Sequence, residues 1–267
     1  MSREKVKIAC FDFAGCEGCQ LAKVNLEDEL LPLLSFVEFV QFREAMDPVG
    51  DDYAIAFIEG SICTPSCVKR IRKVRKQADI LVTVGQCSTH GGLQAMRNGR
   101  RVEEVQREAY PGVEDAPQLE SLPWSLPVSK VVKVDYSIPG CPMDKYEFVR
   151  VVQALLLGKT PQIPSWAVCV ECRLKENECV LDLGFPCMGP VTRAGCDACC
   201  PTGVSPCIGC RGLVPDINEN AQKDILAKHG LTPQEMVNKF RWFNADVELE
   251  GKDEEIQAVL AAIPEED

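Results

Sequence analysis

Sixteen cysteines in 267 residues constrain this chain more than any other feature of its sequence. Only two histidines, His90 and His229, accompany them, so any metal sites must be built almost entirely from thiolates. Dense disulfide frameworks are typical of short secreted domains, whereas clustered cysteines in a reducing compartment more often bind metal. The composition therefore predicts iron–sulfur clusters or all-cysteine zinc sites.

The net charge of −11 indicates which classes of partner the chain avoids. Such an acidic surface repels phosphate backbones, which argues against a general nucleic-acid role. No apolar run reaches the roughly 18 residues that are needed to span a bilayer. No long apolar segment of a signal peptide follows residues 1–7. We therefore expect a cytoplasmic protein with no membrane span and no nucleic-acid partner.

Strand and helix signals alternate over the first 160 residues. Short apolar or β-branched runs predict strands at 7–13, 36–42, 53–58, 80–84 and 131–134. Helices are expected at 21–34, 66–78 and 143–157. This alternation predicts an α/β fold with a parallel sheet that helices cover. A segment from about 109 to 129, rich in proline and acidic residues, is expected to be an irregular loop with a functional or interface role.

The composition of the sequence and its hydrophobic pattern change at Pro161. Segment 161–214 carries nine cysteines with many glycines and prolines and shows little hydrophobic periodicity. Because such a segment cannot build a core from side chains alone, metal ligation must supply much of its folding energy. Short helices are expected at 216–229 and 232–243, and an acidic helix at 251–267. The predicted domains are therefore 1–160 and 161–267.

One group of cysteines follows the predicted strands in glycine-containing segments: Cys16, Cys19, Cys87 and Cys141. In an open parallel sheet the ligand site lies at the carboxyl edge of the strands, so these thiolates are expected to converge. The neighbouring glycines let the backbone approach a bulky inorganic core. Four cysteines are the ligand set of a 4Fe–4S cluster. Structural zinc or unrelated buried thiols are the simpler alternatives.

Two further groups lie in the second part of the chain. The first has the spacing C-x2-C-x6-C-x7-C and consists of Cys169, Cys172, Cys179 and Cys187. The second consists of Cys196, Cys199, Cys200, Cys207 and Cys210. If each cluster takes four ligands, one cysteine of the second group is spare. Zinc ribbons also use CxxC pairs, but several neighbouring sets on one chain favour electron transfer over a single structural site.

These motifs resemble the small subunit of nickel–iron hydrogenases, especially of cytoplasmic enzymes that reduce soluble carriers. The matching segments are CEGC at 16–19, GQC at 85–87, GCP at 140–142, PCMGPVTRAGC at 186–196 and CIGC at 207–210. The similarity covers residues 5–214, and the long GPVTRAGC stretch is specific. The first domain also resembles, more weakly, the 20 kDa cluster subunit of respiratory complex I, which lacks a cysteine-rich second domain.

The resemblance implies a flavodoxin-like domain with a proximal cluster, followed by a small irregular domain with medial and distal clusters and short helices. The proximal ligands would be Cys16, Cys19, Cys87 and Cys141. The distal ligands would be Cys169, Cys172, Cys179 and Cys187. The medial ligands would be Cys196, Cys200, Cys207 and Cys210. Cys200 is preferred to Cys199 because the family's ligand precedes a proline, as Cys200 precedes Pro201.

Departures from the family pattern point to its cytoplasmic branch. Periplasmic members have a histidine on the distal cluster where this chain has Cys169, and a medial proline where it offers a fourth cysteine. All three centres would therefore be 4Fe–4S clusters, and no twin-arginine signal is expected. The nickel–iron centre would belong to a large partner subunit. A further flavin or iron–sulfur subunit would exchange electrons with the distal cluster.

Three functional hypotheses remain at this point. The chain is an electron-transfer subunit of a hydrogenase, an iron–sulfur subunit of a complex-I-like or formate-linked oxidoreductase, or a zinc-stabilised interaction protein. The cysteine-rich second domain favours the first hypothesis over the second. In the first, the hydrogen chemistry takes place in the large subunit, so this chain holds no catalytic residue of its own.

Three cysteines outside the predicted ligand sets lie in the first domain. Cys10 falls within the first strand and is expected in the core. Cys63 and Cys67 follow the third strand on the ligand edge, either as packed free thiols or as a redox-active pair near the proximal cluster. Glu59 lies in a loop that faces the large subunit in the family, either on a proton route or as a solvated or interface carboxylate.

Two other features have a functional and a structural interpretation. His90 follows Cys87 by three residues and either hydrogen-bonds near the cluster or caps the next helix. A basic run either docks an acidic partner or forms a solvated helix face. The run consists of Lys69, Arg70, Arg72, Lys73, Arg75 and Lys76.

Overall fold

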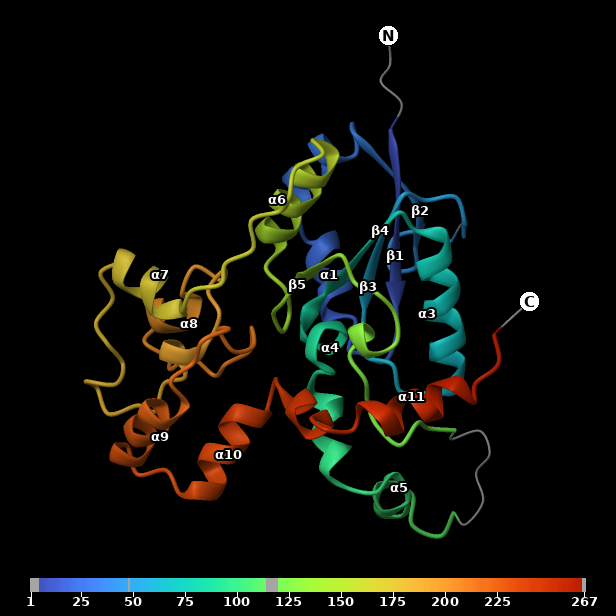
Figure 1. Ribbon diagram of the computed structural model, residues 1–267. Coiled ribbons are helices and arrows are strands. Elements are labelled where there is room, and N and C mark those ends of the chain that lie inside the picture. Colours follow the sequence, from blue (N-terminus) through green and yellow to red (C-terminus); the bar gives the residue numbers. More distant parts are fainter. Residues whose placement is uncertain (1–4, 48, 114–119, 266–267) are drawn as a thin grey trace.

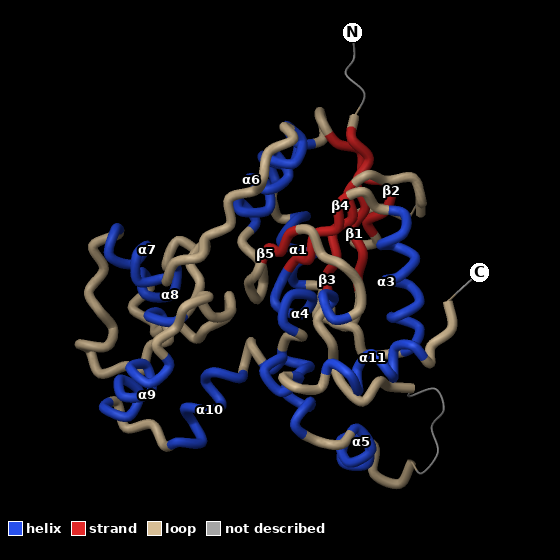
Figure 2. The backbone as a smooth tube through the Cα atoms, in the orientation of Figure 1, coloured by secondary structure: helices blue, strands red, loops and turns tan. Residues whose placement is uncertain are grey.

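Parallel strands and helices alternate along the first part of the chain (Figures 1 and 2). The computed structural model describes residues 5–47, 49–113 and 120–265. The sheet has the strand order β2-β1-β3-β4-β5, and all neighbouring strands are parallel. The strands are β1 (Val6–Asp12), β2 (Val37–Phe42), β3 (Ile55–Glu59), β4 (Ile80–Val84) and β5 (Tyr136–Ile138). The predicted α/β fold is confirmed, and this strand order is that of flavodoxin.

Helices cover both faces of the sheet. The helices of this part are α1 (Gly18–Val24), α2 (Leu30–Leu33), α3 (Pro65–Gln77), α4 (Gly85–His90), α5 (Val102–Ala109) and α6 (Lys145–Leu156). Because successive strand residues point to opposite faces, Phe11 packs toward α3 and Cys10 packs toward α1 and α6. Cys10 is 1% exposed, so its predicted place in the core is confirmed.

Two predicted elements differ from those observed. The strand expected at 131–134 is wrong, because β5 lies at Tyr136–Ile138 and residues 131–134 form no strand. Three valines of that run instead pack, partly buried, against the core on the α3 face. The helix expected at 21–34 is divided into α1, a short 3₁₀ turn and α2. Glu27 adopts a left-handed backbone conformation with φ 54°, which interrupts the helix.

The cysteine-rich part is built from short helices and loops. Its helices are α7 (Val168–Leu174), α8 (Cys199–Thr202), α9 (Glu219–Lys228) and α10 (Pro233–Arg241). The helices expected at 216–229 and 232–243 are confirmed as α9 and α10. A capping box of Thr232 and Glu235 begins α10. The apolar core of this part is small, and two of its nine buried members are Cys187 and Cys207.

The C-terminal helix returns to the sheet (Figure 1). Helix α11 (Asp253–Ala261) places Ile256 and Leu260 in the core on the α3 face. The guanidinium of Arg72 donates hydrogen bonds to the carbonyls of Leu260 (2.8 Å) and Ile263 (3.0 Å). The tail expected to be helical therefore contacts the first part of the chain, and the division at residue 161 stays a prediction.

The segment after α5 packs partly on the end of the sheet. Residues 114–119 of the loop expected at about 109–129 lie outside the described residues. Beyond them, Ile62 and Leu126 pair through two backbone hydrogen bonds of 2.9 Å, and Leu122 bonds to the carbonyl of Cys63. Within the described ranges, no helix has the length and apolar character needed to cross a bilayer.

One partly buried ion pair links α3 to the segment before β5. The Asp135 carboxylate accepts hydrogen bonds from the Arg75 guanidinium (2.6 Å) and the Leu81 N–H (2.9 Å). Burial alone would raise the pKa of Asp135, but these hydrogen bonds outweigh it and lower the pKa below its ordinary value. Since the pKa of Asp135 is lower in the folded than in the unfolded chain, its carboxylate stabilises the fold at pH values above the ordinary carboxyl pKa. This stabilisation is lost as the pH falls through the folded-state pKa.

We therefore expect Asp135→Asn to lower the free energy of unfolding by about 1.5–3 kcal/mol at pH 7, the range of hydrogen bonds to a charged group. The difference from the unsubstituted chain should shrink as the pH falls below about 4. Urea unfolding followed by circular dichroism at several pH values measures this difference. A gap of constant size down to about pH 3, below the ordinary carboxyl pKa, would contradict the assignment.

Candidate metal centre

The strand ends bring four cysteines around one cavity. Cys16 and Cys19 lie between β1 and the first turn of α1, Cys87 lies in α4 directly after β4, and Cys141 follows β5. All four line a cavity with about 340 Å³ of empty space, partly open to solvent. The structure thus brings together the predicted proximal set, and binding of metal by these four thiols stays a prediction.

Glycine makes room for the proximal thiols. Gly85 has φ +81°, and a Cβ atom at this position would collide with the Sγ of Cys19. Gly92 has φ +66°, and its Cβ would lie 2.6 Å from the Sγ of Cys87. The backbone N–H of Met143 donates to the Sγ of Cys19 at 3.4 Å. The backbone therefore approaches the sulfurs closely, as a cluster site requires.

Burial sets the charge state of these thiols. Burial, followed by the charges of the Cys87 and Cys16 thiols, raises the pKa of Cys141 to about 11. Burial is also the main cause of the raised pKa values of Cys19 and Cys87. Thiolates here are unfavourable without a compensating cation. An iron–sulfur core supplies that compensation, so the donor set fits such a group.

Glu59 is buried at the wall of the proximal cavity. It is 3% exposed, and its Oε1 accepts the backbone N–H of Cys19 at 3.1 Å. Its Oε2 has no hydrogen-bond partner among the described residues. Burial raises the pKa of Glu59. Because Glu59 is buried at the last position of β3, its prediction as a solvated loop carboxylate is wrong, and its roles on a proton route or at an interface stay predictions.

The predicted distal set converges beside Gly189. A Cβ atom added to Gly189 would lie 3.3 Å from the Sγ of Cys187 and 3.4 Å from the Sγ of Cys169. Burial, followed by the charges of the Cys187, Cys172 and Cys179 thiols, raises the pKa of Cys169 to about 11. The other two thiols of the set, Cys172 and Cys179, therefore lie within electrostatic range of Cys169.

The predicted medial set lies between the other two. Burial raises the pKa of Cys196 to about 12 and that of Cys207 to about 12. The Sγ atoms of Cys199 and Cys200 are 3.9 Å apart, with Cys199 the more exposed. Burial and the adjacent Cys199 thiol raise the pKa of Cys200 to about 11. Cys199 and Cys200 both lie beside the medial set, so the preference for Cys200 as the ligand stays a prediction.

Two contacts connect the three sets in series. Arg211, directly after Cys210, donates from its Nη1 to the carbonyl of Pro139 (2.9 Å), two residues before Cys141, which joins the medial set to the proximal set. The backbone N–H of Cys207 donates to the Sγ of Cys187 at 3.3 Å, which joins the medial set to the distal set. The order in space is therefore proximal, medial, distal, although the distal set precedes the medial set in the sequence.

The donors are spaced more widely than a single ion requires. Within the part of the chain that the structure describes, no three cysteine, histidine, aspartate or glutamate side chains lie close enough to hold one metal ion together. A 4Fe–4S core is bound by four cysteines. Because each binds a different iron, they need not meet at one point.

Comparison with known proteins decides the family. A family model described as NADH ubiquinone oxidoreductase, 20 kDa subunit, matches residues 16–155. The chain belongs to this family. The match spans all four cysteines of the proximal set, and the relatives that cover most of the chain are hydrogenase subunits.

Several relatives extend over nearly the whole chain. Sulfhydrogenase 2 subunit delta of Pyrococcus furiosus is 36% identical over 89% of this chain and 99% of that protein. A subunit of the vhu F420-non-reducing hydrogenase of Methanocaldococcus jannaschii is 30% identical over 90% of this chain and 93% of that protein. The predicted resemblance to hydrogenase small subunits is confirmed, and these relatives are subunits of oxidoreductases that act on hydrogen.

A solved structure shows the same fold over more than half of the chain. The matching chain comes from an NAD⁺-reducing [NiFe]-hydrogenase in the H₂-reduced state, with a TM-score of 0.55 and 35% identity. The match covers 60% of this chain and 96% of that one. A [NiFeSe] hydrogenase chain from Desulfomicrobium baculatum covers 84% of this chain with a TM-score of 0.55, and at 17% identity it bears on the fold alone.

Sequence reasoning missed a carboxylate that joins the distal and medial sets. Glu171 lies in α7 between the distal cysteines and accepts hydrogen bonds from the backbone N–H groups of Gly195 (2.8 Å) and Ala198 (3.1 Å). Asp197 and Ala198 are left-handed, with φ 56° and 48°. Such a turn directs successive N–H groups toward one anion. Glu171 therefore stabilises the loop that carries Cys196.

We expect Glu171→Gln to destabilise this loop by about 1.5–3 kcal/mol, since the amide offers one uncharged acceptor oxygen where the carboxylate offered two charged ones to the two N–H groups. Hydrogen exchange of the amides of residues 195–200 in the metal-loaded protein measures the change. Glu178→Gln, at an exposed position of the same part of the chain, is the matched control. Equal protection in both variants would refute the role of Glu171.

The remaining cysteines of the first domain are engaged in local contacts. The Sγ of Cys63 lies 3.3 Å from the Oγ of Ser61 and 3.3 Å from the Oγ of Ser125. Cys67 donates its backbone N–H to Thr64 at the start of α3. The thiol contacts of Cys63, and the packing of Cys67 against the apolar core on the α3 face, agree with packed free thiols, and the redox-active alternative stays untested.

His90 and the arginines of the basic run bind other parts of the chain. The Nδ1 of His90 lies 3.0 Å from a carboxylate oxygen of Asp246. Arg70 donates to the carbonyl of Asp12 at 2.6 Å, and Arg72 and Arg75 make the contacts described above. These arginines therefore stabilise the fold, and none of their contacts depends on a partner.

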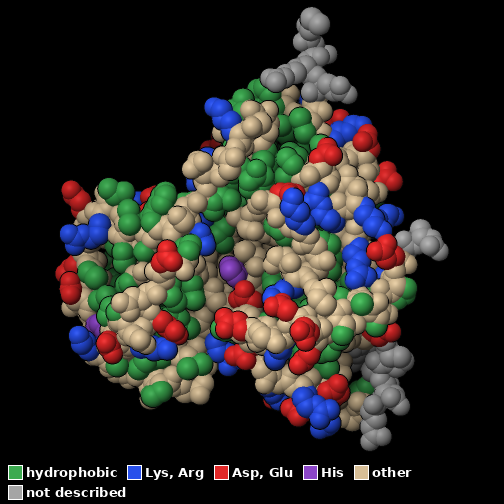
Figure 3. All heavy atoms as spheres, viewed as in Figure 1, with side chains coloured by type: hydrophobic (Ala, Val, Ile, Leu, Met, Phe, Trp, Pro, Cys, Tyr) green, Lys and Arg blue, Asp and Glu red, His purple; other side chains and the backbone are tan. Residues whose placement is uncertain are grey.

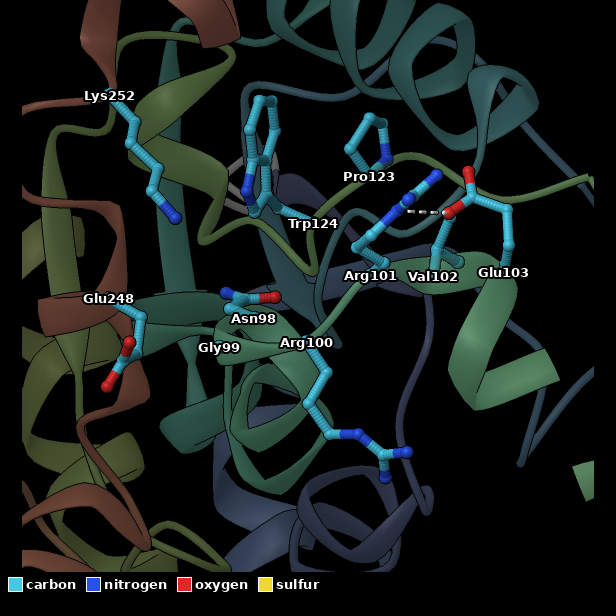
Figure 4. A pocket seen from close by; sticks show the side chains of 10 residues that line it. All are labelled: Asn98, Gly99, Arg100, Arg101, Val102, Glu103, Pro123, Trp124, Glu248 and Lys252. Atoms are coloured by element: carbon cyan, nitrogen blue, oxygen red, sulfur yellow. Dashed lines mark ion pairs between the residues drawn. The ribbon is translucent and has the colours of Figure 1, made fainter. Parts of the chain in front are cut away.

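A second pocket lies away from the cysteines, near the start of α5 (Figure 4). Arg101 and Glu103 form an ion pair there, with 3.5 Å between Nε and Oε2. Trp124 and Lys252 line the same pocket. No cysteine is among its lining residues, so this pocket is separate from the three cysteine sets.

Proposed function

We propose that this chain is the electron-transfer subunit of a cytoplasmic nickel–iron hydrogenase complex. It would conduct electrons between the nickel–iron site of a large subunit and a redox partner subunit through three 4Fe–4S clusters. The observation that carries the proposal is the serial connection of three four-cysteine sets, through the Arg211–Pro139 hydrogen bond beside Cys210 and Cys141 and through the Cys207–Cys187 hydrogen bond. The hydrogenase subunits among its relatives support the same function.

The protein's own contribution would be ligation, burial and spacing. Iron–sulfur clusters, when bound, accept and release single electrons at potentials that charge, hydrogen bonds to sulfur and solvent exposure adjust. The twelve ligands would be Cys16, Cys19, Cys87 and Cys141 in the proximal set, Cys196, Cys200, Cys207 and Cys210 in the medial set, and Cys169, Cys172, Cys179 and Cys187 in the distal set. The N–H donors of Met143, Gly189 and Cys207 would stabilise the reduced state.

Two partner subunits follow from this proposal. The large subunit would cover the open side of the proximal cavity. A flavin or iron–sulfur subunit would contact the distal set, where large apolar side chains are exposed on the lobe of α7 and α8 (Figure 3). Leu174 is 80% exposed and Val204 62% exposed. We propose residues 1–160 and 161–267 as the two domains that present these surfaces.

The test is isolation of the chain with its natural partners. We expect a co-purifying subunit that contains nickel and an assembly that reduces a viologen dye with H₂. The matching family model favours one alternative, an iron–sulfur subunit of a complex-I-like or formate-linked oxidoreductase. An assembly with iron but without nickel, and inactive with H₂, would overturn the hydrogenase proposal in favour of that alternative.

A further inference from the structure

A fully buried arginine lies where the proximal and medial sets meet. The side chain of Arg211 is 2% exposed and directly follows the medial ligand Cys210. Its Nη2 lies 2.7 Å from the Oε2 of Glu147 in α6, and the Glu147 side chain is 1% exposed. Buried charges of this kind require a partner and specific geometry, so the pair has a defined place in the fold.

The same guanidinium holds both cysteine loops. Its Nη1 donates to the carbonyl of Pro139 at 2.9 Å, two residues before Cys141. Its Nε donates to the carbonyl of Ala194 at 2.8 Å, two residues before Cys196. One planar side chain therefore binds a proximal loop, a medial loop and a helix of the sheet domain at once.

The surrounding backbone is shaped around this pair. Gly195 has φ +112°, and a Cβ atom there would lie 2.8 Å from both the Arg211 Cζ and the Glu147 Oε1. That Oε1 has no hydrogen-bond partner among the described residues. The glycine of the GPVTRAGC stretch thus leaves the space that the ion pair fills.

We propose that Arg211 and Glu147 are positioning residues that fix the proximal set against the medial set and thereby set the rate of electron transfer between them. The inference rests on the proposed function. When bound, the two clusters would exchange one electron, the proximal cluster being oxidised as the medial cluster is reduced. Arg211 holds the proximal and medial loops at a fixed separation, and its positive charge would favour the reduced state of both clusters.

The test compares Arg211→Gln, Glu147→Gln and Arg211→Lys in the complete complex with its large subunit. Arg150→Gln, an exposed arginine on the same helix as Glu147, is the matched control. Redox titration followed by electron paramagnetic resonance measures the cluster potentials. Freeze-quenching after mixing with H₂ measures how fast electrons pass from the proximal to the medial cluster.

We expect the potentials of the proximal and medial clusters to fall in Arg211→Gln and to rise in Glu147→Gln. Proximal-to-medial transfer should slow several-fold in both, since the two loops would no longer be held at a fixed separation and a tunnelling rate falls steeply with distance. Arg211→Lys retains the charge but cannot bind both carbonyls and Glu147. It should therefore keep the potentials and slow the transfer.

Unchanged potentials and unchanged transfer in iron-loaded variants would overturn the inference and leave the proposed function intact. Shifts of the cluster potentials in the same direction in Arg211→Gln and Glu147→Gln would also overturn it, because they would indicate a general loss of order in the two cysteine loops. If Arg211→Gln does not retain iron, Arg211→Lys decides by its transfer rate. Absence of clusters from the unsubstituted complex would instead refute the proposed function itself.

Discussion

Replacement of Cys187 by alanine is expected to abolish H₂-dependent reduction of an external acceptor while leaving the proximal set intact. The Sγ of Cys187 is a predicted distal ligand and also accepts the N–H groups of Gly189 (3.4 Å) and Cys207 (3.3 Å). Its removal would deprive the distal centre of a ligand and leave two N–H groups without their acceptor. Iron should fall from about 12 to about 8 per chain or fewer, at four iron per four-cysteine site.

The matched control is Cys67→Ala, which removes a partly buried thiol from the sheet domain without touching a predicted ligand set. Iron content and dye reduction should be unchanged in this variant. Retention of full iron and full acceptor reduction in Cys187→Ala would contradict the assignment of the distal set.

Removal of iron is expected to unfold the cysteine-rich part and spare the sheet. The core of that part contains few apolar side chains besides its cysteines, such as Val168, Val191 and Leu226. Metal ligation can supply on the order of 10 kcal/mol of folding free energy in small domains with structural zinc. The sheet domain has two large apolar cores of its own, one on each face.

Hydrogen exchange after treatment with an iron chelator under reducing conditions measures this difference. We expect protection to be lost over residues 168–213 and kept in β1, β3 and β4. Reconstitution with iron and sulfide should restore the lost protection. Full protection of 168–213 in iron-free protein would show that side-chain packing alone holds this part together.

The sheet and the proximal set were predictable because each has a local sequence signal. β-branched runs indicate strands, and the carboxyl ends of parallel strands meet at one edge. Cys16, Cys87 and Cys141 could therefore be expected around one site from their positions alone. The strand prediction at 131–134 was wrong because a valine-rich loop that packs against a core has the same composition as a strand, and three valines of this run pack in that way.

Long-range polar contacts had no such signal. Arg211 and Glu147 are 64 residues apart, and neither stands in a motif that indicates a buried partner. The arginines of α3 had the appearance of a solvated face, whereas Arg72 binds the end of α11. Glu171 has no sequence signal either, since its acceptor role depends on the left-handed turn that follows Gly195.

Metal and sulfide analysis of the complex, purified without oxygen, tests the central claim most directly. Three 4Fe–4S clusters predict about 12 iron and about 12 acid-labile sulfide per chain, with little zinc. Stoichiometric zinc with little iron would contradict the account and favour a zinc-stabilised interaction protein.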